Sequence, residues 1–402
     1  MKRLVLPLLG LTTLIATSTL AARPAGAGEL TSAGAENLVA LHLEVAAASS
    51  PIHGLTAADF EVREKGKKVS LVDVVEVGEE AGAGTYPEAW RRQVLLLFDL
   101  ELSGPAQFLR ALDLAQEVIS AGLPVGTRIA VATHRPGVGL QLELGPTSVD
   151  QEVTEVLEAL RLEQSEQLGG AAAGPLITAE DLVTSRARGT EAAKGRVQHQ
   201  QGRIMRFVRS LAGLQLLARE VPGGSQVLVF SEGFDSGVIL GNPATQRLDQ
   251  AWSTAQSEAA ARGDIAAVNT ATRHGGGVVE TALFETLSSY EKSGCPIHAI
   301  RLESGADSPS PEKGGRGPNG LVIITEKTEG RLVAEAEDAG RSIGRLLQPL
   351  GSTYLLVFAP PTSAPKGRYR KLDIKLEYGE GDVALSAPPG YYETRSVRRA
   401  EN

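Results

Sequence analysis

Cysteine is nearly absent from this chain of 402 residues, in which Cys295 is the only one. A lone thiol excludes an internal disulfide, so a packed apolar core has to hold the fold together. Hydrophobic residues make up 42% of the sequence, which is sufficient for such a core. The length is typical of two to three domains.

The sequence also lacks an excess of positive charge, since its formal net charge at pH 7 is −8. Nucleic acid and anionic membrane surfaces attract basic proteins, so neither is expected as the main partner. The histidines His134, His274 and His298 are scattered, without the spacing of a zinc site. Neither a phosphate-binding glycine loop nor a G-x-S-x-G nucleophile motif occurs in a strand-to-helix context. We therefore expect no enzymatic activity.

Long apolar runs are missing except at the N-terminus, where Leu4–Leu20 follows Lys2 and Arg3. Small residues come next, and Ala25–Ala27 has the A-x-A pattern of a cleavage site. This order predicts a secretory signal peptide over residues 1–27, with the mature protein in the periplasm or outside the cell. A retained membrane anchor is the alternative interpretation. No other segment is long enough to span a bilayer, so the mature protein should be soluble.

The remaining chain divides by its hydrophobic pattern. Residues 35–80 alternate with a period near two, which indicates a β domain. In residues 90–360, apolar strand-like runs such as Val94–Phe98 and Thr353–Phe358 alternate with helical segments. This pattern predicts an α/β fold with a doubly wound, mostly parallel sheet. Long insertions interrupt it, and loops of this length are functional or disordered; they cover residues 163–200, 235–277 and 303–320.

The C-terminal segment, residues 366–395, departs from the α/β pattern. Residues 371–378 alternate between apolar and charged side chains, as expected of a half-exposed antiparallel strand. We expect this segment to pair with the N-terminal β domain in a small antiparallel β-sandwich beside the larger domain.

Acidic residues follow two of the predicted parallel strands. Asp99, Glu101 and Ser103 come after the first of these strands, and Glu232 follows a later one. Ligands collect at the carboxyl ends of strands in open α/β sheets, and alternate residues of an extended segment project to one side. Carboxylates and a hydroxyl are hard oxygen ligands that suit Mg²⁺ or Ca²⁺. The alternative is a solvated acidic rim on a structural scaffold.

Several segments together resemble the von Willebrand factor A-like (VWFA-related) proteins found in Acidobacteria and similar soil bacteria. They occur in the order of that family and frame nearly all of residues 38–393. These segments are Gly54–Glu64 (GLTAADFEVRE), Val94–Asp99 (VLLLFD), Val227–Gly233 (VLVFSEG), Tyr354–Pro361 (YLLVFAPP), Gly367–Lys371 (GRYRK) and Pro389–Tyr392 (PGYY).

The resemblance implies a von Willebrand factor A-like fold with a metal-ion-dependent adhesion site. That site uses an Asp-x-Ser-x-Ser motif, a threonine from a second loop and an aspartate from a third. Asp99 and Ser103 match the ends of the motif, whereas Glu101 replaces its middle serine and Glu232 the last aspartate. Thr190 is the best candidate for the threonine, although no convincing motif surrounds it. The metal site is therefore degenerate, and Glu101 either binds a cation directly or fills the pocket.

Three functions are consistent with these patterns. The first is an exported, non-enzymatic binding or adhesion-type module that recognises a protein or cell-surface ligand at the strand-end face. The second is a metal-independent structural or assembly component of the cell envelope. The third, an enzyme, is not supported by any recognisable catalytic constellation.

Overall fold

A computed structural model of the chain describes most of the residues after the N-terminal segment. The predicted signal peptide, Thr190 and most of each long insertion lie outside the described residues. The described residues are 38–47, 50–78, 86–124, 126–167, 191–240, 277–302, 319–334, 339–349, 351–360, 367–377 and 383–393. Across them, no helix combines the length and apolar character needed to cross a membrane.

The largest sheet has six strands in the order β11-β10-β9-β6-β7-β8. Neighbouring strands are parallel from β11 to β7, and β8 joins the edge of the sheet antiparallel to β7. Every residue of β6 is buried, as expected of a central parallel strand covered on both faces. The strands are β6 (Gln93–Asp99), β7 (Arg128–Arg135), β8 (Gly139–Thr147), β9 (Ser225–Ser231), β10 (Ile297–Arg301) and β11 (Leu332–Ala334).

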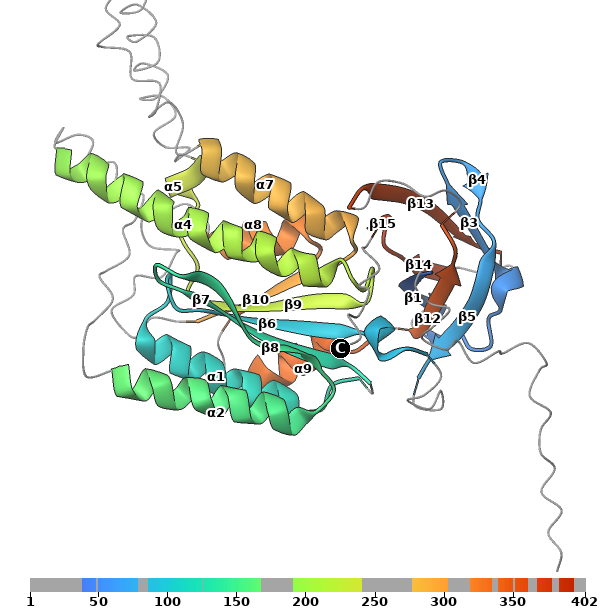
Figure 1. Cartoon of the computed structure of the whole chain (residues 1–402), viewed down its shortest axis with the longest axis horizontal. Helices are drawn as coiled ribbons and strands as arrows, with labels where there is room; N and C mark the ends of the chain where they lie inside the picture. The colour runs from blue at the N-terminus through green and yellow to red at the C-terminus, as the bar shows by residue number, and fades with distance from the viewer. Residues whose placement is uncertain are drawn as a thin grey trace, which may run out of the picture.

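Helices cover both faces of this sheet (Figure 1). Leu95 and Leu97 of β6 pack in a core with α4, α5, α7 and α8 on one face. The alternate residues Leu96 and Phe98 pack in a second core with α1, α2 and α9 on the other face. The helices are α1 (Pro105–Ser120), α2 (Asp150–Gln167), α4 (Glu191–Ala218), α5 (Gly237–Leu240), α7 (Gly277–Lys292), α8 (Gly320–Lys327) and α9 (Ala339–Leu347).

The segments near the two ends of the described chain form two smaller antiparallel sheets beside the larger one. One has the order β14-β1-β12-β5 with β2 paired to β1, and the other has the order β15-β13-β3-β4. A shared apolar core includes Leu41, Phe60, Tyr354 and Tyr391. The elements of this part are β1 (Val39–Ala47), β2 (Ser50–Pro51), η2 (Ala57–Asp59), β3 (Phe60–Glu64), β4 (Lys67–Lys68), β5 (Leu71–Val77), η3 (Glu88–Trp90), β12 (Ser352–Phe358), β13 (Tyr369–Leu376), β14 (Val383–Ser386) and β15 (Gly390–Tyr392).

One strand lies in a different sheet from the one that the sequence predicts. The segment Thr353–Phe358, assigned above to the parallel sheet, belongs to β12, which pairs antiparallel with both β1 and β5. All residues of β12 are buried. A central antiparallel strand covered on both faces has the same continuous apolar pattern as a central parallel strand, so composition alone does not separate them.

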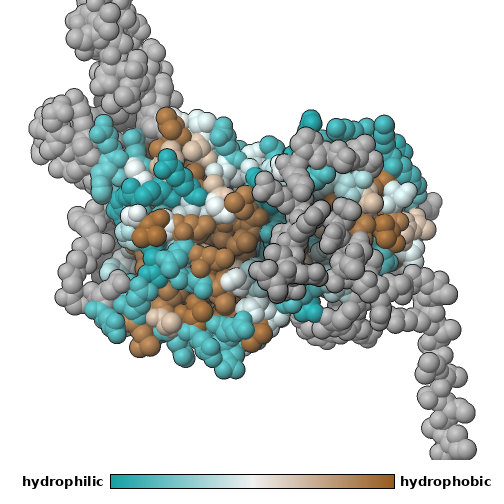
Figure 2. All heavy atoms as spheres, viewed as in Figure 1, coloured by the Kyte–Doolittle hydropathy of each residue, from teal (hydrophilic) through white to brown (hydrophobic). Residues whose placement is uncertain are grey.

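The expectation of a mixed α/β protein with more than one sheet is confirmed. Figure 2 shows apolar side chains gathered over the edge of the large sheet at β8, between α4 and α2. Leu142 of β8, Leu162 of α2 and Leu216 of α4 are among the exposed large apolar side chains.

The small sheets lie beside the amino ends of the parallel strands, at the far side of the large sheet from the carboxyl ends (Figure 1). The small sheets therefore leave the carboxyl ends of the parallel strands uncovered.

Candidate functional site

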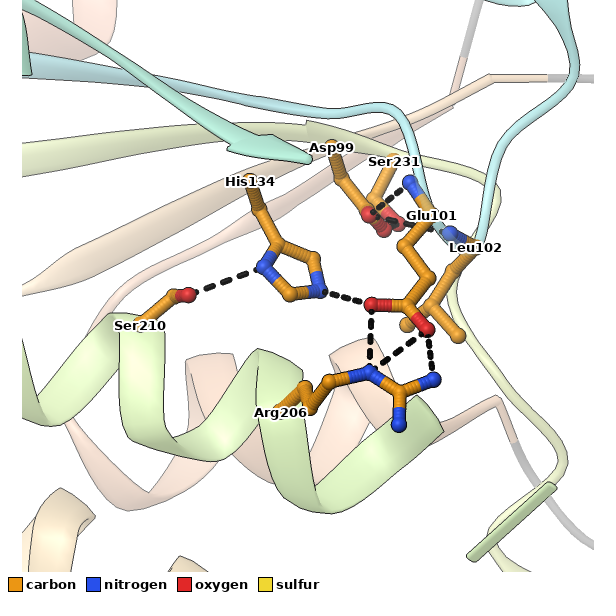
Figure 3. Close-up of polar contacts among 7 residues, drawn as sticks. All are labelled: Asp99, Glu101, Leu102, His134, Arg206, Ser210 and Ser231. Carbon is orange, nitrogen blue, oxygen red and sulfur yellow. Dashed lines mark hydrogen bonds and ion pairs between the residues drawn. The ribbon is translucent and has the colours of Figure 1, made fainter. Parts of the chain in front are cut away.

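Asp99, the last residue of β6, connects the loop after its own strand to the neighbouring strand β9 (Figure 3). Its Oδ1 atom accepts hydrogen bonds from the backbone N–H groups of Glu101 and Leu102, each at 3.0 Å. Its Oδ2 atom accepts a hydrogen bond of 2.5 Å from the hydroxyl of Ser231. Burial raises the pKa of the Asp99 carboxyl, while these hydrogen bonds and His134 act against that increase. Asp99 therefore uses one carboxylate oxygen to hold the backbone of the loop and the other to hold the side chain of Ser231.

Glu101 turns toward α4, where it meets a basic side chain that the sequence analysis did not select. Its Oε1 atom accepts a hydrogen bond of 2.9 Å from Nε of Arg206, and Nη2 of the same guanidinium also donates to it. Glu101 is only 4% exposed, whereas the Arg206 side chain is 36% exposed. The guanidinium thus neutralises an almost buried carboxylate from its solvent side.

His134, at the end of β7, lies on another side of the Glu101 carboxylate. Its Nε2 atom is 3.1 Å from Oε2 of Glu101, without the geometry of a hydrogen bond, and its Nδ1 atom is 2.8 Å from the hydroxyl of Ser210. Burial lowers the pKa of the imidazole, and Asp99 and Glu101 oppose that effect. His134 is fully buried in a polar setting, so its contacts hold Glu101 in place from within the protein.

Ser103 and Glu232 connect the loops after β6 and β9. The hydroxyl of Ser103 accepts a hydrogen bond of 3.0 Å from the backbone N–H of Glu232. In return, the carboxylate of Glu232 accepts a hydrogen bond of 2.8 Å from the backbone N–H of Gly104. Asn319, the N-cap residue of α8, donates a further hydrogen bond of 2.8 Å to the carbonyl of Glu232. The two loops are therefore tied to each other and to the start of α8.

The structure brings Asp99, Glu101, Ser103 and Glu232 to one face, but their contacts do not suit a divalent cation. Asp99 accepts three hydrogen bonds from the protein, and Glu101 is paired with Arg206. A guanidinium beside these carboxylates repels a metal ion. Within the described part of the chain, no group of three or more His, Cys, Asp or Glu residues is arranged to hold a metal. As they stand, the four residues do not fit Mg²⁺ or Ca²⁺.

Arg203 is a second basic residue of this face that the sequence analysis did not select. It lies one turn before Arg206 on α4 and is half-buried. Burial lowers the pKa of its guanidinium, while the carboxylates of Glu101 and Asp99 oppose that change. The spacing of the two arginines is a helical signal present in the sequence. Its significance depends on where α4 packs, which the sequence does not show.

No protein-family model matches this sequence, and no curated protein matches it. BatB from Bacteroides thetaiotaomicron, a conserved hypothetical protein, is a similar solved structure, with 12% identity and a TM-score of 0.31 over 64% of this chain and 98% of BatB. An aerotolerance-related membrane protein from Bacteroides fragilis has 12% identity and a TM-score of 0.30, over 64% of this chain and 98% of that one. The manganese-loaded TRAP protein of Plasmodium vivax has 7% identity and a TM-score of 0.29, over 78% of this chain and 95% of TRAP. With TM-scores this low, the likenesses carry no conclusion about the function of this chain.

Proposed function

We propose that this chain is an exported, non-enzymatic binding module. In this proposal the larger α/β part is a von Willebrand factor A-like domain with a doubly wound sheet and a degenerate metal site. It recognises a protein ligand at the strand-end face, which we define as the loops after β6 and β9 together with the adjoining side of α4. The sequence resemblance supports this assignment, and the pattern of residues 1–27 supports export.

The observation that carries the proposal is the mutual connection of the two loops. Ser103 and Glu232 each bond the backbone of the other loop, and Asp99 bonds Ser231 on the neighbouring strand. Such hydrogen bonds between the loops hold their surface in one conformation. The loops then lose less conformational entropy when a ligand binds. The face also lies at the carboxyl ends of parallel strands, where open α/β sheets bind their ligands.

The proposal includes no chemical step. Asp99 and Glu101 are the buried carboxylates of the face, and both are held by hydrogen bonds from the protein. A general base has to reach the proton that it removes from a substrate. In these positions the two carboxylates act as structural groups that shape the loops.

A matched pair of bulky substitutions tests the location of the binding surface. Ala106 is exposed in the first turn of α1, next to the loop after β6, and Ala58 is exposed in η2 of the small sheets. The mature chain, Ala106→Trp and Ala58→Trp are each used to capture proteins from the native cell envelope, with quantitative mass spectrometry of what is retained.

We expect a partner that wild type and Ala58→Trp retain and that Ala106→Trp loses by about tenfold or more, equivalent to roughly 1.4 kcal/mol of binding. Loss of the partner in Ala58→Trp alone would show that the binding surface is on the small sheets. That result would favour an assembly component of the envelope. Equal melting temperatures of the three proteins show that the substitutions act on binding.

A further inference from the structure

Two guanidinium groups project from the same side of α4 at the strand-end face. Arg203 and Arg206 are three residues apart, a spacing that places side chains next to each other on a helix. Arg206 uses Nε and Nη2 to hold Glu101, as Figure 3 shows, and its Nη1 makes no hydrogen bond to another described residue. One edge of this guanidinium is therefore available to a ligand.

The guanidinium of Arg203 has no hydrogen bond or ion pair with any residue that the structure describes. It is half-buried, so it has lost part of its hydration without gaining a hydrogen bond from the described part of the chain. Burial has the largest effect on the pKa of Arg203 and lowers it. The carboxylates of Glu101, Asp99 and Glu232 act in the opposite direction, so all three lie in its electrostatic environment. A partly desolvated charge without a partner is unfavourable, and an anion that paired with it would relieve that cost.

The neighbouring carboxylates do not hydrogen-bond the guanidinium of Arg203, because each already accepts hydrogen bonds from other groups. Arg206 pairs with Glu101, Ser231 and two backbone N–H groups hold Asp99, and Gly104 donates to Glu232. Arg203 therefore remains as a cationic group beside carboxylates whose positions are set by other contacts.

We propose that Arg203 and Arg206 bind one carboxylate group of an acidic segment of a protein partner, and that this site works without a metal ion. The proposal rests on the proposed function, since it assumes that the strand-end face is the binding surface. A guanidinium presents pairs of parallel N–H donors that match the two oxygens of a carboxylate. Arg206 thus has two roles, because it fixes Glu101 with one side of the guanidinium and offers the other side to the ligand.

Local charge favours a carboxylate over a phosphate. Both groups match the geometry of a guanidinium, but a phosphate carries close to two negative charges at neutral pH. Glu101, Asp99 and Glu232 repel a dianion more strongly than a monoanion. The net charge of −8 also opposes non-specific attraction of acidic peptides, so measurable binding requires a specific site.

The test uses a fluorescein-labelled octapeptide of glutamate and the mature chain in EDTA, with binding followed by fluorescence anisotropy. An octapeptide of glutamine is the uncharged probe. Arg203→Gln removes the half-buried guanidinium, and Arg209→Gln makes the same change at an exposed position of the same helix. Melting temperatures of both variants show that they remain folded.

We expect the glutamate peptide to bind in EDTA, the glutamine peptide not to bind, and Arg203→Gln to weaken binding about tenfold or more. Arg209→Gln should bind as wild type does. Equal affinity of wild type and Arg203→Gln would overturn the proposal, as would binding that EDTA abolishes and Mg²⁺ restores. Inorganic phosphate that displaces the peptide at lower concentration than acetate does would also overturn it, in favour of a phosphate site.

The outcome is separable from that of the capture experiment. If Ala106→Trp loses a native partner but the glutamate peptide does not bind wild type, the strand-end face binds its ligand by other contacts. The proposal of a carboxylate site is then wrong, and the proposed function stands. If the peptide binds through Arg203 but no native partner depends on Ala106, the carboxylate site stands and the proposed function is wrong.

Discussion

At the scale of single residues, Glu101 is held between two basic side chains in a position that water barely reaches. Arg206 approaches its carboxylate from α4, and His134 approaches from β7. A charge with so little exposure is stable only when it is paired and hydrogen-bonded. The ion pair therefore holds the loop after β6 against α4.

Replacing Arg206 by alanine should leave this buried charge without its partner. We expect Arg206→Ala to lower the free energy of unfolding by roughly 2 to 4 kcal/mol, measured by urea denaturation at pH 7. Arg209→Ala, at an exposed position of the same helix, should change it by less than about 0.5 kcal/mol. Equal stability of the two variants would mean that the Glu101 carboxylate does not depend on the guanidinium.

A second prediction at this scale concerns His42, a buried residue of β1 whose Nε2 atom is 2.6 Å from the carbonyl oxygen of Trp90. Burial lowers the pKa of His42 from 6.5 to about 4, and Arg92 contributes in the same direction. Between these values the unfolded chain binds a proton that the folded chain does not. The stabilising contribution is therefore complete above pH 6.5 and is lost as the pH falls toward 4.

Over this window the contribution of His42 amounts to roughly 3 kcal/mol, because each unit of pKa shift is worth about 1.4 kcal/mol. We expect His42→Gln to flatten the decline of unfolding free energy between pH 7 and pH 4.5 in urea titrations. His199→Gln, at an exposed position, should leave the decline unchanged. An unaltered slope in His42→Gln would show that His42 is not held neutral by burial.

At the scale of elements, the turn between α4 and β9 depends on glycine for two reasons. Gly223 has φ +71°, a left-handed backbone conformation that residues with a Cβ atom rarely adopt. A Cβ atom there would lie 2.2 Å from the backbone oxygen of His42 and 2.9 Å from Cδ of Pro388. This turn therefore lets the larger part of the molecule pack directly against β1 and the segment before β15.

A comparison of two glycines separates the contact from the backbone conformation. Gly137, between β7 and β8, has φ +72°, but a Cβ atom there would meet nothing within 4 Å. We expect Gly137→Ala to lower the unfolding free energy by about 1 kcal/mol from the conformation alone. Gly223→Ala should lower it by roughly 3 kcal/mol or more, because the steric overlap adds to that cost.

Chemical denaturation of the two variants checks this difference. Similar losses at both positions would show that the turn can move away from His42 and Pro388 at little cost, and that the junction is looser than its contacts indicate.

Elements differ in how far their own sequence predicts them. The continuous apolar run of β6 predicts a buried strand, and its alternate residues do face two cores. The same kind of run in β12 misleads, because the strand is buried between other partners in a small antiparallel sheet. Which sheet a buried strand joins depends on pairings with segments that are hundreds of residues away. A local pattern contains no information about those pairings.

At the scale of the whole molecule, the small sheets and the large sheet are joined through polar and aromatic contacts. The backbone N–H of His42 donates to the carbonyl of Pro222 at 2.9 Å. Arg92, before β6, donates to Thr353 and Glu44 at 3.3 and 3.2 Å. The guanidinium carbon of Arg219 lies 4.0 Å from the ring centroid of Tyr392. Three strands of the small sheets, β1, β12 and β15, and two segments of the larger part therefore meet at one junction.

These contacts predict that the two parts unfold together. We expect a single calorimetric transition for the mature chain, with equal calorimetric and van't Hoff enthalpies. In Gly223→Ala this transition should move to lower temperature as a whole. Two resolved transitions, or movement of only part of the heat absorption, would show that the small sheets unfold independently.

The sequence by itself determined the features that depend on local pattern and on residue chemistry. These include the alternation of strands and helices after residue 90, the exclusion of an internal disulfide, and the position of acidic residues after the strands. Asp99, Ser103 and Glu232 were selected in this way, and the structure brings them to one face with Ser231. Local pattern was sufficient because strand ends and turns are set by neighbouring residues.

Only the tertiary structure decided what those residues contact. The sequence left Glu101 either as a cation ligand or as a group that fills the pocket, and α4 places the guanidinium of Arg206 against it. More than a hundred positions separate the two residues, and the helix turns the required face toward the strand end. Long-range packing also sets β12 in the small sheet and leaves Arg203 beside the carboxylates. Such pairings depend on the packing of whole elements, which no local stretch of sequence specifies.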